Sequence, residues 1–134
     1  MKKFLIFVLF IVMGIMNTTY ARAESETLMK GEKDGVMVEF IHAPETDYPH
    51  WIRIDNQGSF SIRFNSLADE FYQISSSGKH YLMKVEKRYG GSDLNPGEVA
   101  LMSCYEYMKP SSSIKKMLVI LNYGKLKIEL TPVD

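Results

Sequence analysis

The sequence predicts an all-β protein, and more specifically an immunoglobulin-like antiparallel β-sandwich of seven to eight strands. Three observations lead to this fold class. From Gly35 onward, apolar and polar residues alternate with a period of two. Turn residues interrupt the alternation about every ten positions, as in a sandwich or barrel. No segment carries a helical apolar stripe longer than about two turns.

Residues 1–23 have the features of a cleaved secretory signal peptide. Lys2 and Lys3 precede an apolar run of 13 residues at 4–16, and residues 21–23 (Ala-Arg-Ala) match the small-x-small pattern that a signal peptidase accepts. A membrane-spanning helix needs about 20 apolar residues, so the run is short for an anchor. We therefore expect an exported protein, periplasmic or extracellular, with no membrane span after cleavage.

The expected mature chain, residues 24–134, is mildly acidic. The full sequence has sixteen basic and sixteen acidic residues, and loss of Lys2, Lys3 and Arg22 with the signal leaves a formal charge of −3. This charge, without any basic run longer than a pair, argues against nucleic acid and against an anionic membrane surface as partners. The single cysteine, Cys104, excludes an internal disulfide, so the domain must be stabilised by packing alone.

The first half of the mature chain is expected to contain a lead-in and four strands. Residues 24–34 are polar and show no clear period, which predicts a flexible lead-in before a domain at 35–134. Turn residues at 56–58 (Asn-Gln-Gly) and 75–78 (Ser-Ser-Ser-Gly) separate the later candidate strands. The alternating apolar residues of the four strands are Val36, Val38 and Phe40; Ile52 and Ile54; Phe60, Ile62 and Phe64; and Phe71 and Ile74.

The second half is expected to supply four more strands, at 79–87, 98–108, 117–121 and 125–131. The last two form a predicted hairpin around the turn Asn-Tyr-Gly at 122–124. In the last strand Leu126, Ile128 and Leu130 alternate with charged residues, which suits an antiparallel strand with one solvated face. Tyr81, Met83 and Val85 share one face of the strand at 79–87, and in the strand at 98–108 Val99, Leu101, Ser103 and Tyr105 oppose Ala100, Met102 and Cys104.

Three structural motifs follow one another between Trp51 and Leu130. Residues 51–58 (WIRIDNQG) form an alternating apolar strand followed by Asn-x-Gly, residues 71–81 (FYQISSSGKHY) form a hairpin ending in Gly-Lys-x-Tyr, and residues 93–98 (DLNPGE) contain the turn Leu-x-Pro-Gly-Glu. Together they resemble the telokin-like group of small exported immunoglobulin-like domains. The resemblance implies the sandwich fold and a bacterial source, and it implies no assigned activity, because most of that group have none.

No combination of residues points to catalysis, so we expect a protein that is not an enzyme and needs no cofactor. Cys104 lies within an alternating apolar pattern, as a buried structural thiol does. No serine occurs in a G-x-S-x-G or S-x-x-K context. Asp69 and Glu70 are adjacent, so on a strand they face opposite sides. Gly90 and Gly91 are not followed by the lysine, serine and helix of a phosphate-binding loop.

The aromatic residues favour a binding role. Tyrosine and tryptophan offer a large rigid surface with a polar tip, and they are enriched where proteins bind partners. The segment Tyr-Pro-His-Trp at 48–51 is the predicted recognition patch, with Tyr48, His50 and Trp51 as its contact residues. The alternative is that Trp51 packs over the sheet. The leading hypothesis is thus a non-catalytic domain that binds an unknown protein or cell-surface partner.

Two alternatives remain open. His42, Glu45, Asp47 and His50 span nine residues and, with His80, could supply ligands for a metal-binding or metal-dependent envelope protein. Their spacing matches no tetrahedral zinc pattern, so no metal is assigned. The other alternative is an inhibitor or accessory subunit of a secreted enzyme.

Overall fold

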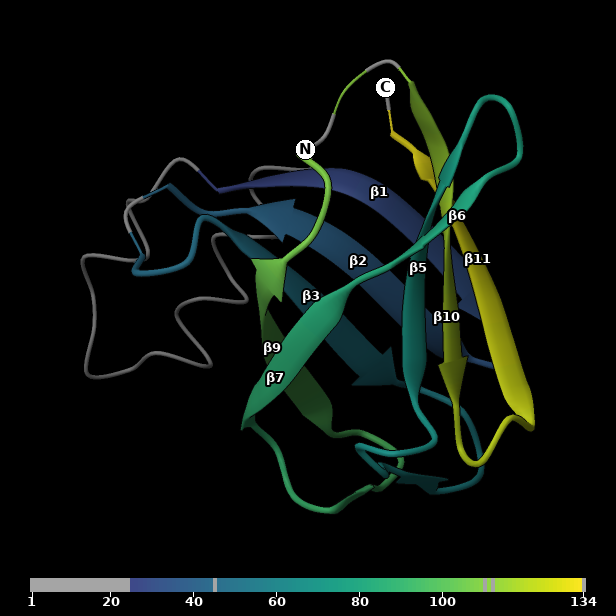
Figure 1. Ribbon diagram of the computed structural model, residues 1–134. Coiled ribbons are helices and arrows are strands. Elements are labelled where there is room, and N and C mark those ends of the chain that lie inside the picture. Colours follow the sequence, from purple (N-terminus) through teal and green to yellow (C-terminus); the bar gives the residue numbers. More distant parts are fainter. Residues whose placement is uncertain (1–24, 45, 110, 112, 134) are drawn as a thin grey trace.

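A computed structural model of the chain describes residues 25–44, 46–109, 111 and 113–133 (Figure 1). The predicted signal peptide at 1–23 lies outside these residues. The described ranges contain eleven strands and no helix, so the prediction of an all-β antiparallel fold is confirmed. Over the same ranges, no helix with the length and apolar character needed to cross a membrane was found.

Nine strands form one antiparallel sheet in the order β6-β5-β10-β11-β1-β2-β3-β9-β7, and the short strands β4 and β8 pair with each other. The strands in chain order are β1 (Glu26–Lys33), β2 (Val36–His42), β3 (His50–Asn56), β4 (Ile62–Arg63), β5 (Glu70–Ser75), β6 (His80–Leu82), β7 (Lys84–Tyr89), β8 (Asp93–Leu94), β9 (Val99–Glu106), β10 (Ile114–Leu121) and β11 (Leu126–Pro132).

The large sheet curls until its two ends nearly meet, which gives an almost closed barrel. The end strands β6 and β7 are consecutive in the chain, with only Met83 between them. β6 pairs with β5, β7 pairs with β9, and the Met83 N–H donates to the Phe71 carbonyl at 2.7 Å. Beyond Met83, β7 runs alongside β9 and away from β5, so the two ends of the sheet separate (Figure 1).

This closure corrects two expectations about the fold. The expected sandwich of two sheets is not evident, because the segment 80–89 pairs at both ends of one continuous sheet and joins what would otherwise be separate layers. The strand count is eleven rather than seven or eight, because the predicted strand at 79–87 is divided at Met83 and the strands β1 and β8 were not predicted. The predicted strand around Phe60 and Phe64 shrinks to the two residues of β4.

The interior of the barrel is filled by the apolar residues that alternate along the strands. On β11 every second residue is buried, while Lys127 and Glu129 between them are exposed. This period of two is what a strand with one buried face requires. The inward residues of the central strands are Val36, Val38 and Phe40; Ile52 and Ile54; Ala100, Met102 and Cys104; Met117, Val119 and Leu121; and Leu126, Ile128 and Leu130.

Residues 24–34 were expected to be a flexible lead-in, but the structure contains β1 here. β1 pairs with β2 along its length and also with β11, and Met29 is buried in the core. Asp34 (φ 53°) and Gly35 (φ 82°) make a two-residue turn between β1 and β2. Two successive positive φ angles are typical of the type I′ hairpin, for which Asp-Gly is a preferred sequence.

Two buried amide side chains fix segments that the strand ladders do not join. Asn56 Nδ2 donates to the carbonyl oxygens of Phe60 and Leu94, both at 2.9 Å. Gln73 bonds both backbone groups of Met108, donating to its carbonyl at 2.6 Å and accepting from its N–H at 2.7 Å. Because both side chains are fully buried, these bonds replace the water that the amides lose on folding.

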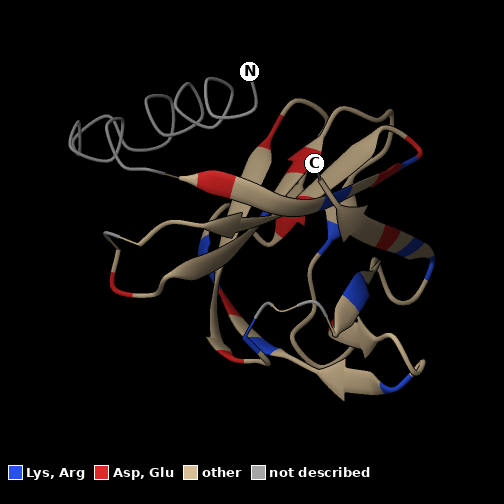
Figure 2. Ribbon diagram, turned by 90° about the horizontal axis from the view of Figure 1, so that it is seen from above, with Lys and Arg blue, Asp and Glu red and all other residues tan. Residues whose placement is uncertain are grey.

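Charged residues of both signs occur on the same strands, β1, β3, β7 and β11 among them (Figure 2). Arg53 on β3 lies between two carboxylates, with Glu39 at 2.9 Å and Asp55 at 3.1 Å. The pair with Glu39 joins β2 to β3 and the pair with Asp55 lies within β3, so charge is balanced locally.

Candidate functional site

Trp51 fastens the loop at 43–49 to the sheet. Its indole N–H donates to the carbonyl of Tyr48 at 2.8 Å and lies 3.0 Å from the hydroxyl oxygen of Thr46. Its ring stacks on that of Tyr89 in β7, with centroids 6.4 Å apart. The indole N–H is therefore used within the chain, and the contacts of Trp51 are those of a residue that packs over the sheet.

Tyr48 is half-buried beneath an arginine from β7. The guanidinium carbon of Arg88 lies 5.0 Å from the centre of the Tyr48 ring, within the range of a cation–π contact. Arg88 also donates from Nε to the buried hydroxyl of Ser103 at 2.9 Å and pairs with Glu86 at 3.4 Å. Tyr48 and Trp51 thus contact β7 and loop residues rather than forming a free aromatic surface.

His50 is packed among aromatic rings where β2 and β3 meet. Its ring stacks on Phe40 at 5.3 Å, and its Nδ1 lies 2.5 Å from the hydroxyl oxygen of Tyr107. Burial, with smaller contributions from the neighbouring His42 and Lys109, lowers the pKa of His50 from 6.5 to about 4. At neutral pH the imidazole is uncharged, so one ring nitrogen carries a hydrogen and the other accepts, and the hydrogen bond between Nδ1 and the Tyr107 hydroxyl forms with either tautomer.

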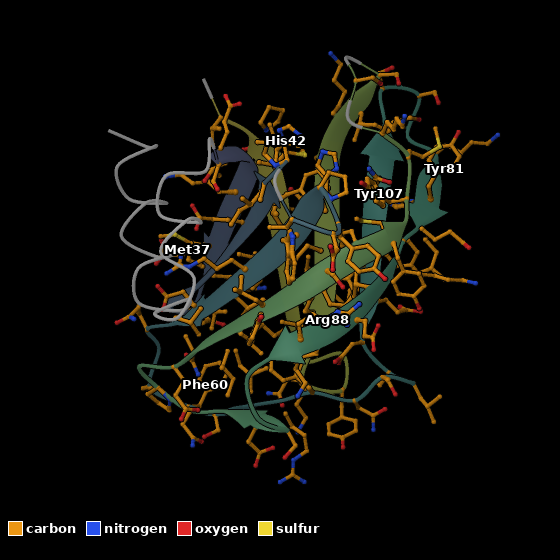
Figure 3. All side chains as sticks on the ribbon, turned by 90° about the vertical axis from the view of Figure 1, so that its left-hand side faces the viewer. Met37, His42, Phe60, Tyr81, Arg88 and Tyr107 are labelled. Carbon is orange, nitrogen blue, oxygen red and sulfur yellow. The ribbon has the colours of Figure 1, made fainter. Side chains whose placement is uncertain are left out.

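The predicted metal ligands are brought together only in part. His42 and His50 face each other across β2 and β3, with ring centroids 4.9 Å apart (His42 is labelled in Figure 3). Asp47 is exposed in the loop, and Glu45 lies outside the described residues. His80 lies edge-on to Tyr72 in the β5–β6 pair. Within the described ranges, no three His, Cys, Asp or Glu side chains are grouped closely enough to hold a metal ion.

Cys104, on β9, has the environment expected of a structural thiol. It is buried in the interior of the barrel, and burial raises the pKa of its thiol well above the ordinary value. A thiol that stays protonated at neutral pH is a poor nucleophile and a poor metal ligand.

A groove of about 420 Å³ opens where the barrel fails to close, between the start of β5 and β7. We call it the seam groove. Its floor is formed by core residues, Phe71, Met83 and Met102. The full set of lining residues is Phe64, Ser66, Leu67, Asp69, Glu70, Phe71, Leu82, Met83, Lys84, Val85, Lys87, Met102 and Tyr105.

Three large apolar side chains around the seam groove are exposed to solvent. The exposed fraction is 95% for Leu67, 59% for Leu82 and 51% for Tyr105. They come from the turn before β5, from β6 and from β9, so they are far apart in the sequence. An exposed apolar rim over an apolar floor is typical of an interaction surface rather than of an ordinary monomer surface.

The two walls of the seam groove carry opposite charges. On the β7 wall, Lys84 pairs with Glu106 at 3.3 Å, and Lys87 extends over the Phe64 ring, with Nζ 5.6 Å from its centre. On the β5 wall, Asp69 accepts a hydrogen bond from a backbone N–H through Oδ2, and burial raises the pKa of its carboxyl. Its Oδ1 is buried with no hydrogen-bond partner among the described residues.

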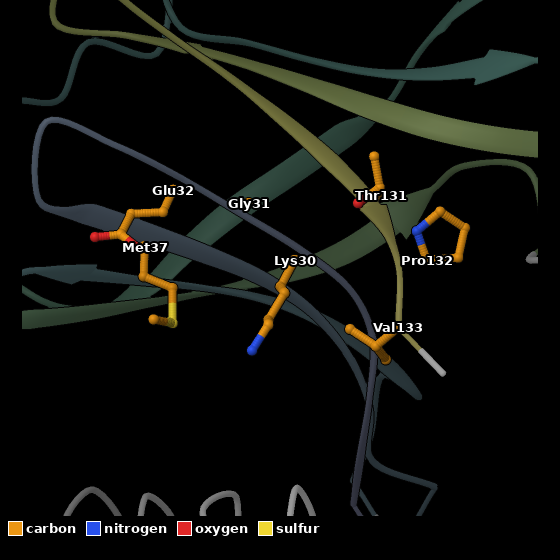
Figure 4. A pocket seen from close by; sticks show the side chains of 7 residues that line it. All are labelled: Lys30, Gly31, Glu32, Met37, Thr131, Pro132 and Val133. Atoms are coloured by element: carbon orange, nitrogen blue, oxygen red, sulfur yellow. The ribbon is translucent and has the colours of Figure 1, made fainter.

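A second cavity, of about 500 Å³, lies on the outside of the barrel where β1, β2 and β11 meet (Figure 4). Its charged lining residues are Lys30 and Glu32, and the rest of the lining is Gly31, Met37, Thr131, Pro132 and Val133. Only one charge of each sign lines it, and no exposed large apolar residue does. It is therefore the weaker candidate for a binding site.

Sequence reasoning singled out Tyr48, His50 and Trp51 as the binding surface and missed the seam groove. The one local sign of the groove was Leu67, an apolar residue inside the otherwise polar turn at 65–69. No protein-family model, curated protein or solved structure matches this chain. The likeness to telokin-like domains accordingly stays a prediction.

Proposed function

We propose that this protein is an exported, bacterial, non-catalytic domain that binds a protein partner through the seam groove. The telokin-like resemblance and the signal-peptide pattern support export and a bacterial source. The proposal replaces the predicted contact patch at Tyr48, His50 and Trp51 with a different surface, since those three side chains are engaged within the chain. The finer assignment of the all-β fold as immunoglobulin-like is part of the same proposal.

One observation carries the proposal: Leu67, Leu82 and Tyr105 are exposed around a groove whose floor is the hydrophobic core. Leaving such side chains in water forgoes about 1.5–3 kcal/mol for each that a partner could bury. A non-catalytic role is supported by the chemistry of the buried groups. Cys104 stays a protonated thiol and His50 is a neutral imidazole whose Nδ1 is already bonded to Tyr107.

Site-specific photo-crosslinking tests this function in the cells that produce the protein. Benzoylphenylalanine is substituted for Leu82, and the irradiated, purified protein is examined by mass spectrometry. The expected result is an adduct with one polypeptide. A matched probe replaces Lys127, which is exposed on β11 and does not line the groove. No polypeptide adduct at Leu82, or equal adducts at Leu82 and Lys127, would contradict the proposal.

The identity of the crosslinked molecule also distinguishes between classes of partner. A secreted enzyme in the adduct would make this protein its inhibitor or accessory subunit. A lipid adduct would show that the groove holds an apolar small molecule and would contradict a protein-binding role.

Metal binding is the second candidate, and the contact between His42 and His50 favours it. Two imidazole nitrogens are half of a usual zinc site, so a stable ion would need ligands that the described residues do not bring near. Elemental analysis after purification without chelators decides between the two functions. About one ion of zinc or copper per chain would support the metal function, and its absence would exclude it.

A further inference from the structure

We propose that the occupant of the seam groove is an extended acidic polypeptide segment that pairs with the free edge of β7 as an additional strand. This inference deepens the proposed function and rests on it, because it specifies how a protein partner binds in the same groove. The partner is defined by its chemistry: an extended backbone, apolar side chains towards the groove floor, and acidic side chains beside the lysines of β7.

One edge of β7 is unpaired. This strand is the last in the sheet, and β9 is its one strand partner in the described part of the chain. Among the described residues, the bond from Met83 to Phe71 is the last backbone hydrogen bond between the two walls before they separate. An edge strand presents a row of free N–H and C=O groups, which can pair with an added strand.

The seam groove leaves room for a strand beside that edge of β7. The seam groove measures about 420 Å³, within the usual range for ligand sites of about 300–1,000 Å³. β7 is six residues long, so an added strand of similar length would place about three side chains over the groove floor. Phe71, Met83 and Met102 on that floor would contact those side chains.

The β7 wall of the groove is basic. Two of the three basic residues of β7, Lys84 and Lys87, line the groove, whereas Arg88 lies over Tyr48 and pairs with Glu86, the one acidic residue of the strand. Opposite charges on neighbouring strands stabilise pairing, and like charges destabilise it. A second copy of this chain pairing through β7 would bring the basic residues of both copies together, so this edge disfavours self-association and favours an acidic partner.

Asp69 supplies an acceptor on the opposite wall. Its Oδ1 is buried and unpartnered among the described residues, and Asp69 lines the groove. A strand added to β7 has N–H groups on its other edge as well, and these face the β5 wall. One of them could donate to Asp69, which would satisfy an oxygen that is otherwise left without a hydrogen bond.

The experiment is a titration of the ¹⁵N-labelled chain 24–134 by NMR with three capped six-residue peptides. The probe is Ac-EVEVEV-NH2, which alternates acidic and apolar residues. The controls are Ac-KVKVKV-NH2, with the charge reversed, and Ac-EVEPEV-NH2, in which proline interrupts strand pairing. The expected result is that the acidic peptide shifts backbone amides of residues 84–89 and binds at least about fivefold more tightly than either control.

A pair of protein variants locates the effect. Lys84→Glu is expected to weaken binding of the acidic peptide at least about fivefold, because it reverses the charge beside the added strand. Lys127→Glu makes the same change on an exposed position of β11 and is expected to leave binding unchanged. The amide spectra of both variants report whether they are folded.

Two results would overturn the inference: no shift of residues 84–89 with the acidic peptide, or equal binding of all three peptides. The outcome is independent of the crosslinking result. A polypeptide adduct at Leu82 without strand pairing in the titration would leave a protein partner that binds as a folded surface. Absence of the adduct would remove the proposed function itself.

Discussion

His50 is held as a neutral imidazole by the residues packed around it. Phe40 covers its ring, the Tyr107 hydroxyl meets Nδ1, and His42 and Lys109 disfavour a positive charge. Its pKa is about 4 in the folded protein against 6.5 as the ordinary value. Between these values the unfolded chain binds a proton that the folded protein does not, so the free energy of unfolding falls as pH decreases from 6.5 to 4.

His50→Gln should make stability less dependent on pH in that window. We expect the wild type to lose about 1–2 kcal/mol more than the variant between pH 7 and pH 4.5, less than full linkage because the ring is only half-buried. Urea unfolding at the two pH values measures this. His80→Gln, which changes a histidine on the exposed strand β6, is the control and should behave as the wild type. The same pH dependence in all three proteins would show that His50 is not the group responsible.

Gln73 provides a test of the buried amide that joins β5 to the segment after β9. Gln73→Leu removes two hydrogen bonds and leaves both backbone groups of Met108 without these partners. We expect the free energy of unfolding to fall by about 2–4 kcal/mol. Gln57→Leu alters an exposed amide and should change stability by less than about 0.5 kcal/mol. Denaturant unfolding of both variants measures the difference, and equal effects would contradict this role for Gln73.

At the scale of elements, β1 and β11 approach each other so closely that a glycine is required. A Cβ atom at Gly31 would overlap the backbone carbonyl oxygen of Glu129, which cannot move without disturbing β11. Gly31→Ala should therefore lower the free energy of unfolding by more than about 2 kcal/mol, or prevent folding.

The matched change is Gly91→Ala, since a Cβ there meets only ordinary contacts at 3.5 Å or more. We expect it to change the melting temperature little, and soluble yield together with thermal unfolding reports on both variants. Wild-type stability in Gly31→Ala would mean that β1 does not cross β11 as closely as described. β1 would then have less part in the barrel than its pairing implies.

The elements that sequence predicted well are those with regular alternation or a clear turn. β2, β3 and the β10–β11 hairpin are where the pattern and the turns predict strands, although β10 begins at Ile114, three residues earlier than expected. β1 was missed because its charged residues hide a weak pattern, with Met29 as its one buried apolar residue. The Asp-Gly turn at 34–35 was a usable signal, because it is a preferred sequence for a two-residue hairpin.

The division at Met83 could not be predicted. Alternation along 79–87 tells which side chains face inward, and Met83 and Val85 do pack on the core. It does not tell which strands lie on either side. The change of partner from β5 to β9 depends on how the whole sheet curls. The seam groove follows from that change, so apart from Leu67 no local pattern indicates the closure or the groove.

At the scale of the whole molecule, one incomplete closure accounts for both the fold and the proposed function. The barrel buries its core as a closed barrel would, yet β7 keeps one edge without a strand partner in the described part of the chain. Edge strands are sites of unwanted association, and charged residues commonly protect them. Lys84 and Lys87, which line the groove, fit that role, and in our proposal they also favour an acidic partner.

Hydrogen exchange of backbone amides is the most direct test of this open edge. β10 has a strand on both sides, whereas β7 has one, so about every second amide of β7 lacks an acceptor in the sheet. In the free protein, measured by NMR, we expect those amides of Lys84–Tyr89 to exchange at least about a hundredfold faster than the amides of Leu118–Leu121. Uniform protection of β7, equal to that of β10, would mean that the barrel is closed and would contradict the account.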